Sequence, residues 1–401
     1  MFVGMVFGPP LTAILDTSWL SAINVLGYVG LCAMVLEGGL NTPLGHALPS
    51  LPLSICVAIT GITFPICISL LYFNLFLHPS STLLDSFAAG AALSSTSLGT
   101  TFAVIGGSGL AKGKLGAVLM TAAMADDVVG LVLLKVVVVL GQSDHSHSIG
   151  WIVARPIVAS VGLIFISWIL ARWVLKPTIA KISGWMPEDR RHEFNFIVIV
   201  LTTTGYIAVA SLAGTSVLLG AFISGIVLAS ISQSLPPSLP SFQSTFALLI
   251  SPLLSTFLQP VFFASIGFAI PVRRMFEGRL VWRGLVYALL MMVAKMVTGV
   301  WVPIGEALDN SNTPAAISAA QPSPPQSPSP SPQSSSPSQT PEPPSSLLIP
   351  STLLSLAMVA RGEIGLLIAQ LSRSASLLDE DLFLISVWAI VVCTIVGPVG
   401  V

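Results

Sequence analysis

The chain has very little charge. Only 8% of its 401 residues are Asp, Glu, Lys or Arg, whereas a soluble domain carries about 25%. So few charged side chains cannot cover the water-exposed surface of a protein of this length. The net charge of −1 leaves no basic surface for nucleic acid, so we expect no nucleic-acid partner. The sequence also lacks a nucleophile–base set and a phosphate-binding loop, so we expect neither an enzyme nor a cofactor.

Cysteine is also scarce. The four cysteines lie in apolar runs and form no CxxC pair, so we interpret them as small core or lipid-facing residues rather than as a metal or disulfide site. The first residues, MFVGMVFGPPL, lack the basic region and the small-residue cleavage site of a signal peptide. We expect residues 1–10 to be the tail of a membrane helix.

Long apolar runs are abundant, with 54% hydrophobic residues and a mean hydropathy of +0.91. In lipid the backbone must satisfy its own hydrogen bonds, which leaves helices or a closed barrel. Continuous rather than alternating apolar runs favour helices. We therefore predict an all-α polytopic membrane protein with an N-terminal stub and about eleven full helices, at residues 18–38, 51–77, 82–107, 113–140, 149–175, 192–212, 214–232, 242–270, 280–303, 347–371 and 379–401.

One segment differs from all others. Residues 309–346 contain 11 of the 30 prolines and are otherwise rich in serine, so they cannot form a core. We predict a disordered cytoplasmic loop, partly in polyproline II conformation, that separates a first membrane part at 1–303 from the last two helices at 347–401. The loop is either a spacer or a regulatory, phosphorylated segment.

Loop charges predict an orientation. The expected loops at 108–114 and 172–191 contain seven Lys and Arg residues, whereas those at 78–81 and 141–148 contain none. The positive-inside rule places the first two in the cytoplasm. Counting helices onward then places four arginines between 273 and 283 on the outside, against the same rule.

Two adjacent aspartates, Asp126 and Asp127, lie inside the apolar run at 115–140. A charge at mid-bilayer costs roughly 2.5–3.5 kcal/mol on insertion scales, so a passive span would not carry two. Adjacent helical residues point about 100° apart, so one carboxylate can face a cavity while the other faces a neighbouring helix. Two carboxylates this close do not ionise independently. We predict a site that exchanges a proton for a small cation; the alternative is a structural pairing with basic residues.

Lys295 lies in another apolar span, YALLMMVAKMVTGVWV. A buried ammonium needs a partner, and we expect an aspartate of the pair. The pair is either a static structural contact or a switch that breaks when the aspartate binds a cation.

Two spans are interrupted. Arg361 and Glu363 flank Gly362 inside one span, and a run of hydroxyl residues that includes Ser95 and Thr96 interrupts another. Interrupted spans in both halves of a chain are typical of inverted-repeat transporters. We expect the broken ends to cross beside the aspartates, where exposed carbonyls and the hydroxyls of Ser95 and Thr96 could contact a dehydrated cation. The sequence does not decide whether Arg361 and Glu363 stabilise the crossing or bind the ion.

The chain resembles the monovalent cation:proton antiporters of the sodium/hydrogen exchanger superfamily, in the branch with paired aspartates. The resemblance rests on Lys295 within VAKMVTG and on a series of motifs that follow the order of the family over nearly the whole chain: GPPL (8–11), LEGGLNT (36–42), ALSSTSLG (92–99), MADDVVGLVLL (124–134), AGTSVLLGAFISG (213–225), PVFFASIGFAI (260–270) and ARGEIGLLIA (360–369). The small residues of 213–225 also predict close helix packing.

The resemblance implies a thirteen-helix fold with a core domain, a dimerisation domain and a linking helix at 149–175. It implies that Asp127 binds the transported cation, that Asp126 pairs with Lys295, and that the protein is a homodimer. Because Asp-Asp is associated with electrogenic exchange in this family, it also implies an electrogenic exchanger of Na⁺ or Li⁺ for protons that works by elevator-like alternating access.

The chain departs from the family pattern in two places. The first family helix has no counterpart and the second is only a stub, which raises the alternative of a truncated, inactive chain. The insertion at 309–346 replaces a short loop. No nucleotide-binding domain follows residue 401, which argues against ligand-gated potassium efflux, although a K⁺/H⁺ antiporter of the same fold remains an alternative. A channel is disfavoured because the buried charges gather in one place.

Overall fold

The computed structural model describes residues 2–8, 14–42, 44–76, 82–96, 114–142, 149–185, 187–234, 236, 239–305, 307 and 348–400. These residues form helices and turns, with no strand among them. Eight of the described helical segments are long and apolar enough to cross a membrane, and two others are shorter apolar helices, Leu83–Ser94 and Val217–Ser232. The predicted all-α polytopic membrane protein is confirmed, whereas the total of eleven full helices stays a prediction.

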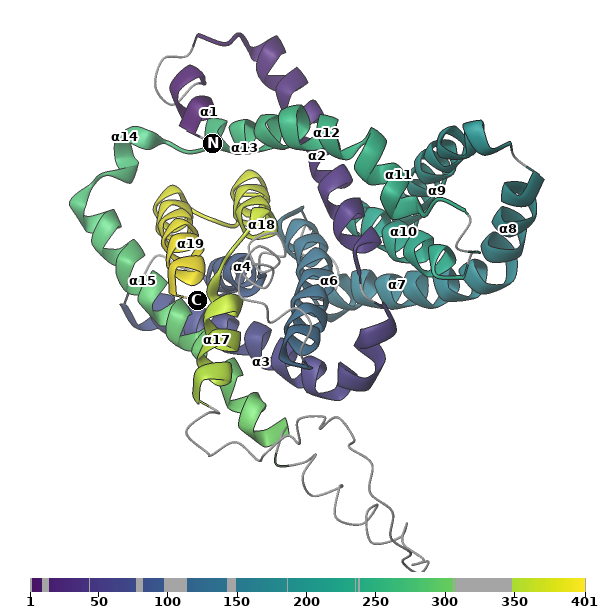
Figure 1. Ribbon diagram of the computed structural model, residues 1–401. Coiled ribbons are helices and arrows are strands. Elements are labelled where there is room, and N and C mark those ends of the chain that lie inside the picture. Colours follow the sequence, from purple (N-terminus) through teal and green to yellow (C-terminus); the bar gives the residue numbers. More distant parts are fainter. Residues whose placement is uncertain are drawn as a thin grey trace, which may run out of the picture.

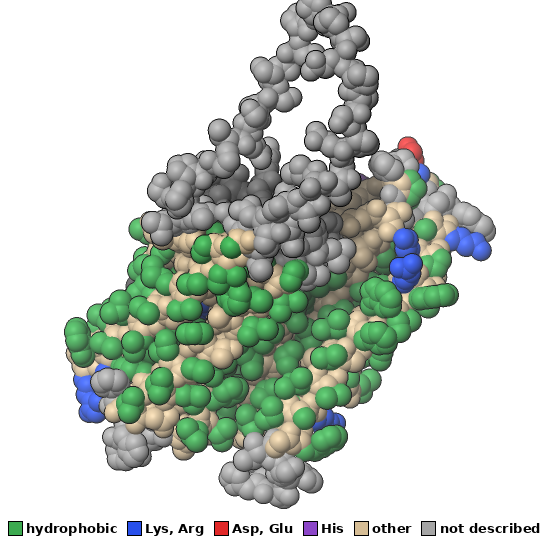
Figure 2. All heavy atoms as spheres, turned by 90° about the horizontal axis from the view of Figure 1, so that it is seen from below, with side chains coloured by type: hydrophobic (Ala, Val, Ile, Leu, Met, Phe, Trp, Pro, Cys, Tyr) green, Lys and Arg blue, Asp and Glu red, His purple; other side chains and the backbone are tan. Residues whose placement is uncertain are grey.

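The outer surface agrees with a lipid environment. Figure 2 shows hydrophobic side chains over most of the visible face, with Lys and Arg confined to its edges. Many large apolar residues are exposed on the membrane-spanning helices, including Phe165, Trp168 and Leu212. Such a surface is stable only when lipid or another apolar partner covers it.

The helices form two groups (Figure 1). The first group is here called the scaffold. It comprises α1 (Phe2–Phe7), α2 (Thr17–Leu40), α9 (Arg191–Ala213), α10 (Val217–Ser232), α11 (Phe242–Leu249), α12 (Ser251–Leu253), the π-helical turn η4 (Leu254–Leu258) and α13 (Gln259–Phe268). Its helices pack on one another mainly through α2 and α10. Glycines allow the close approach of α2 and α10. A methyl group added at Gly225 would lie 2.5 Å from the carbonyl oxygen of Leu36.

The second group, here called the core, contains the titratable residues. Its members are α3 (Leu44–Phe76), α4 (Leu83–Ser94), α6 (Lys114–Gln142), α15 (Gly278–Met296) with the 3₁₀ turn η5 (Val297–Val300), α17 (Leu348–Val359), α18 (Glu363–Ser374) and α19 (Glu380–Gly400). Both halves have the same order: a helix, an interrupted helix and a second helix. In each half the first helix packs on both others, α3 on α4 and α6, and α15 on α17 and α19. This is the expected inverted-repeat organisation.

A long helical segment joins the two groups. It begins as α7 (Ile149–Leu170), passes through the π-helical turn η2 (Ala171–Leu175) and continues as α8 (Lys176–Trp185). It packs on α6 at one side and on α9 and α10 at the other. The expected loop at 172–191 was therefore wrong: the chain stays helical to Trp185, because the basic residues there lie on the exposed side of a helix rather than in a turn.

Three further expectations have a mixed outcome. The helix expected at 242–270 is divided into α11, α12, η4 and α13. The one expected at 82–107 is described only as α4 and the following Ser95 and Thr96. The loop at 309–346 lies outside the described residues.

Candidate ion-binding site

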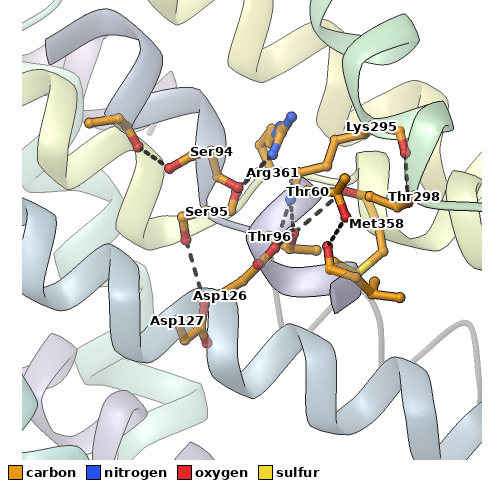
Figure 3. Close-up of polar contacts among 12 residues, drawn as sticks. Thr60, Ser94, Ser95, Thr96, Asp126, Asp127, Lys295, Thr298, Met358 and Arg361 are labelled. Carbon is orange, nitrogen blue, oxygen red and sulfur yellow. Dashed lines mark hydrogen bonds and ion pairs between the residues drawn. The ribbon is translucent and has the colours of Figure 1, made fainter. Parts of the chain in front are cut away.

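The two interrupted spans meet beside the middle of α6, as expected. The helix α4 ends at Ser94, α17 ends at Val359 and α18 begins at Glu363, so three helix ends lie in one place (Figure 3). Their backbones come very close: a methyl group added at Gly365 would lie 2.6 Å from the carbonyl oxygen of Ala92. Glycine at 365 therefore permits a crossing that a larger residue would prevent.

Asp126 lies at the centre of a fully buried polar cluster. Its Oδ2 atom lies 2.6 Å from Lys295 Nζ and accepts a hydrogen bond of 2.7 Å from Thr96 Oγ1. Lys295 also donates to Thr96 Oγ1, at 3.0 Å. Thr96 therefore accepts from the ammonium and donates to the carboxylate, which links all three groups. The ion pair expected from the sequence is present, whereas its part in coupling stays a prediction.

The second carboxylate oxygen of Asp126 differs from the first in its hydrogen bonding. Asp126 Oδ1 is buried and has no hydrogen-bond partner among the described residues. A buried anionic oxygen without a donor is costly. A proton or a cation at this oxygen would remove that cost, which is a property expected of an exchange site.

Asp127 points to a different element. Its side chain is 4% exposed, and its Oδ1 atom lies 3.5 Å from Ser95 Oγ, at the broken end of α4. Figure 3 shows Asp127 directed toward Ser95 while Asp126 is directed toward Thr96 and Lys295. The expected divergence of the two carboxylates is confirmed, and each of them meets one of the two hydroxyls.

Carbonyl oxygens also face this region. The carbonyl oxygen of Met358, in the last turn of α17, lies 3.5 Å from Thr96 Oγ1. Carboxylate, hydroxyl and carbonyl oxygens are hard ligands, which suit hard cations such as Na⁺. Among the described residues no group of three or more His, Cys, Asp or Glu side chains forms a metal cluster.

Arg361 lies at the crossing and is fully buried. Its Nη1 atom donates to the carbonyl oxygens of Ser94 and Ser95, at 3.1 and 3.2 Å. These carbonyls belong to the C-terminal end of α4, where a cation is favourable to the helix dipole. The Thr394 hydroxyl in turn donates to the carbonyl oxygen of Arg361, at 2.7 Å. The geometry favours the stabilising role for Arg361; Glu363 begins α18, and its side chain lies outside the described part of the structure.

Some neighbours of the site were not predicted. Gly61 of α3 packs on the lysine, since a methyl group added there would lie 3.0 Å from Lys295 Nζ. On the neighbouring residue, Thr60 Oγ1 accepts a hydrogen bond of 2.8 Å from Trp301 Nε1. The glycine within the apolar run AITGITF of α3 was the available sequence signal, because glycine in a membrane helix often marks a close approach.

Comparisons with known proteins identify the family of this chain. The family model for the sodium/hydrogen exchanger transmembrane region matches residues 1–401. A probable Na⁺/H⁺ antiporter, GerT of Bacillus cereus, is 24% identical over 387 residues, which cover 96% of this chain and 85% of GerT. The Na⁺/H⁺-K⁺ antiporter GerN of the same organism is 22% identical, over 99% of this chain and 87% of GerN.

A solved structure is similar to the whole fold. The sodium proton antiporter MjNhaP1 from Methanocaldococcus jannaschii superposes with a TM-score of 0.67 at 15% identity, over 99% of this chain and 91% of MjNhaP1. The similarity at this identity concerns the fold. Together with the family match over every residue, it leads to one conclusion: the chain is a multi-pass membrane protein that belongs to the sodium/hydrogen exchanger family of cation:proton antiporters.

Proposed function

We propose that this protein exchanges Na⁺ or Li⁺ for protons and that Asp127 and Asp126 carry the exchange. The observation that carries the proposal is the arrangement at the crossing of two broken helices. One carboxylate lies against a hydroxyl at a helix end, and the other is held by a lysine. In this scheme Asp127 binds the cation, with Ser95 and Thr96 as neighbouring oxygens.

The lysine gives the scheme its proton coupling. When a cation occupies the carboxylates, the attraction between Asp126 and Lys295 weakens and the ammonium can release its proton. When the cation leaves, Lys295 takes up a proton and the ion pair of 2.6 Å re-forms. Asp127 also takes up a proton when the cation leaves and releases it when a cation binds, so two protons move for each Na⁺ and we propose electrogenic exchange. Arg361 acts as a positioning residue that holds the end of α4.

The two-group fold supports alternating access. The candidate site lies entirely on core helices, and α7 with α8 connects the core to the scaffold. We propose that the core moves against the scaffold and carries the site from one side of the membrane to the other. We further propose that the scaffold forms a homodimer, since α9 exposes apolar side chains that include Phe196, Ile197 and Val200.

A K⁺/H⁺ exchanger is the second candidate. It is favoured by the likeness to GerN, which is described as a Na⁺/H⁺-K⁺ antiporter. The oxygen ligands at the crossing do not by themselves select between the two ions.

Liposomes with a pH-sensitive dye inside provide the test. External Na⁺, Li⁺ or K⁺ should each be added to the wild type, to Asp127→Asn and to Asp379→Asn, a control that changes an exposed aspartate between α18 and α19. We expect a Na⁺- or Li⁺-driven pH change that Asp379→Asn retains and Asp127→Asn loses at least 100-fold. An imposed membrane potential should change the rate of exchange, because electrogenic exchange moves net charge across the membrane. Normal exchange by Asp127→Asn would refute the site, and a response to K⁺ alone would establish the second candidate.

A further inference from the structure

A groove lies between the linking segment and α9, apart from the polar cluster of the core. Its volume is about 380 Å³. Leu163, Ser167, Leu170 and Leu175 line one side, and Tyr206 and Val209 line part of the other. We call this the α7–α9 groove.

The π-helical turn η2 shapes the groove. Leu163, Ser167 and Leu170 follow the spacing of one α-helical face, and position 174 would come next. The wider turn at Ala171–Leu175 shifts the register by one residue, so Leu175 lines the groove instead. Val174 is left 50% exposed. A π-turn costs stability and is frequent at functional sites, and here its effect is to extend an apolar face toward the end of the span.

The groove lies at the depth of membrane lipid. Both of its walls belong to segments apolar and long enough to cross the membrane, Val153–Ile182 and Arg191–Ala213. Trp151, near the start of the linking segment, and Trp173, within η2, are both strongly exposed, and 22 residues of helix span about 33 Å. This separation matches the hydrocarbon thickness of a bilayer, and Trp is enriched at both interfaces. The end of the groove at Leu175 is therefore at the level of the lipid headgroups.

Polar groups in the groove are few, and one is unsatisfied. The hydroxyls of Ser167 and Thr202 donate to carbonyl oxygens of their own helices, Leu163 and Val198. The phenol of Tyr206 lies beside Ser167, yet its buried oxygen has no hydrogen bond of normal geometry to the described residues. Tyr206 is 7% exposed. A buried phenol usually has a partner, so the groove lacks one acceptor.

Two basic residues of the linking segment lie close in sequence to Leu175, at the headgroup end of the groove. Arg172 lies within η2 and Lys176 begins α8. Both are exposed, and neither has an ion-pair partner in the part of the chain that the structure describes. Ser167 precedes Arg172 by five residues, so it lies about 7.5 Å deeper in the membrane. Ester carbonyls of a phospholipid lie below its phosphate, and at this depth one can accept from Tyr206.

We propose that the α7–α9 groove binds one acyl chain of an anionic phospholipid whose phosphate pairs with Arg172 and Lys176. The apolar walls accept the chain, the phenol of Tyr206 donates to an ester carbonyl, and the two cations select an anionic headgroup. Basic residues close to the membrane surface attract anionic lipid by about 1 kcal/mol each. The lipid would fill the space between the linking segment and the scaffold.

Gly205 provides a variant that fills the groove. It lines the groove, and a side chain added there would meet no atom within 4 Å. Gly205→Leu should therefore fold and occupy the space of the acyl chain. Gly162→Leu is its matched control, since Gly162 also has open space but does not line the groove. For the headgroup, Arg172→Gln with Lys176→Gln is compared with Lys181→Gln, a further exposed lysine on α8.

Binding is measured on the purified full chain in detergent, by native mass spectrometry and thermal unfolding with added phosphatidylglycerol or phosphatidylcholine. We expect Gly205→Leu to weaken binding of phosphatidylglycerol at least ten-fold and Gly205→Ala to weaken it two- to three-fold. Gly162→Leu should leave it unchanged. The Arg172 and Lys176 double variant should lose the preference for phosphatidylglycerol, whereas Lys181→Gln should keep it.

Three results would overturn the proposal. Equal lipid binding by wild type and both Gly205 variants would mean that the groove holds no lipid. Equal affinity of the wild type for the two lipids would refute the anionic headgroup. A change of oligomeric state in Gly205→Leu with unchanged lipid binding would show that a second copy of the chain covers the groove.

Discussion

The ion pair between Asp126 and Lys295 is completely removed from water. Both side chains are 0% exposed, and Thr96 contacts both. An ion pair in such a place contributes little net stability, because desolvation offsets most of the attraction. Replacing only one of the two residues nevertheless destabilises the fold strongly, because the other charge stays buried without a counter-ion.

Lys295→Ala should lower the free energy of unfolding by about 3–5 kcal/mol, because Asp126 loses its counter-ion. Protonation of Asp126 would recover part of this loss, so the pH dependence of exchange should change as well. Thermal unfolding of detergent-solubilised protein measures the first effect, and pH profiles in liposomes measure the second. Lys135→Ala, which changes a partly exposed lysine of α6, is the control.

The double variant Lys295→Ala with Asp126→Ala separates the pair from its surroundings. It should be more stable than Lys295→Ala alone, because no unpaired carboxylate remains. Equal stability of both variants, together with an unchanged pH profile, would show that the pair has no energetic role.

Close contact of helices depends on glycine in the scaffold as well as at the crossing. Gly39 and Gly225 let α2 and α10 approach until backbone touches backbone. The motif AGTSVLLGAFISG was expected to serve packing, and the contact of Gly225 with the Leu36 carbonyl confirms this. Small residues at helix interfaces are the usual means of association where lipid removes the hydrophobic driving force.

Gly225→Val should force α2 and α10 apart and lower the melting temperature by several degrees, with overpacking costs of about 1–3 kcal/mol. Gly162→Val adds the same atoms where nothing lies within 4 Å, so it should melt like the wild type. Thermal unfolding of both variants in one detergent makes the comparison. If Gly225→Val melted like Gly162→Val, the close contact would have no importance for stability.

Charged residues at the surface connect the segment between scaffold and core to the first turn of α19. The short helix α14 (Val272–Met275) lies between α13 and α15, and its Arg274 pairs with Glu380 and Asp381 at the start of α19, at 3.1 and 2.7 Å. Trp388 Nε1 donates to the Met275 carbonyl oxygen at 2.8 Å. The carboxylates, chiefly Glu380, raise the pKa of Arg274, so it stays charged. These pairs neutralise one of the four arginines whose predicted outside position conflicts with the positive-inside rule.

Arg274→Gln should change the exchange rate at least two-fold while the melting temperature shifts by no more than about 2 °C, since exposed ion pairs contribute about 0–1 kcal/mol. The rate should change because α14 would lose its ion pairs with α19 and keep only the hydrogen bond between Trp388 and Met275. Arg273→Gln alters the neighbouring residue, which has no ion pair among the described side chains, and should leave both quantities unchanged. Identical rates for the two variants would exclude a role of these ion pairs in transport.

The sequence alone determined the environment and the chemistry of this protein. Low charge and continuous apolar runs require a helical membrane protein, because lipid leaves no other way to satisfy the backbone. Asp126, Asp127 and Lys295 could be identified for the same reason: each is too costly in an apolar span unless it has a function or a partner. The interruptions near Ser95 and Arg361 were visible as polar residues and glycines within such spans.

Only the tertiary structure decided which of these residues meet. The pairing of Asp126 rather than Asp127 with Lys295 follows from the rotation of α6 against α15, which local sequence does not encode; before the structure, it rested on family resemblance. Thr96 links Asp126 to Lys295, and Gly61 packs against Lys295, only because segments distant in the sequence come into contact. The continuous helix through Trp185 and the groove beside it arise from a π-turn, whose shift of one residue has no sequence signature. Long-range packing fixes these features.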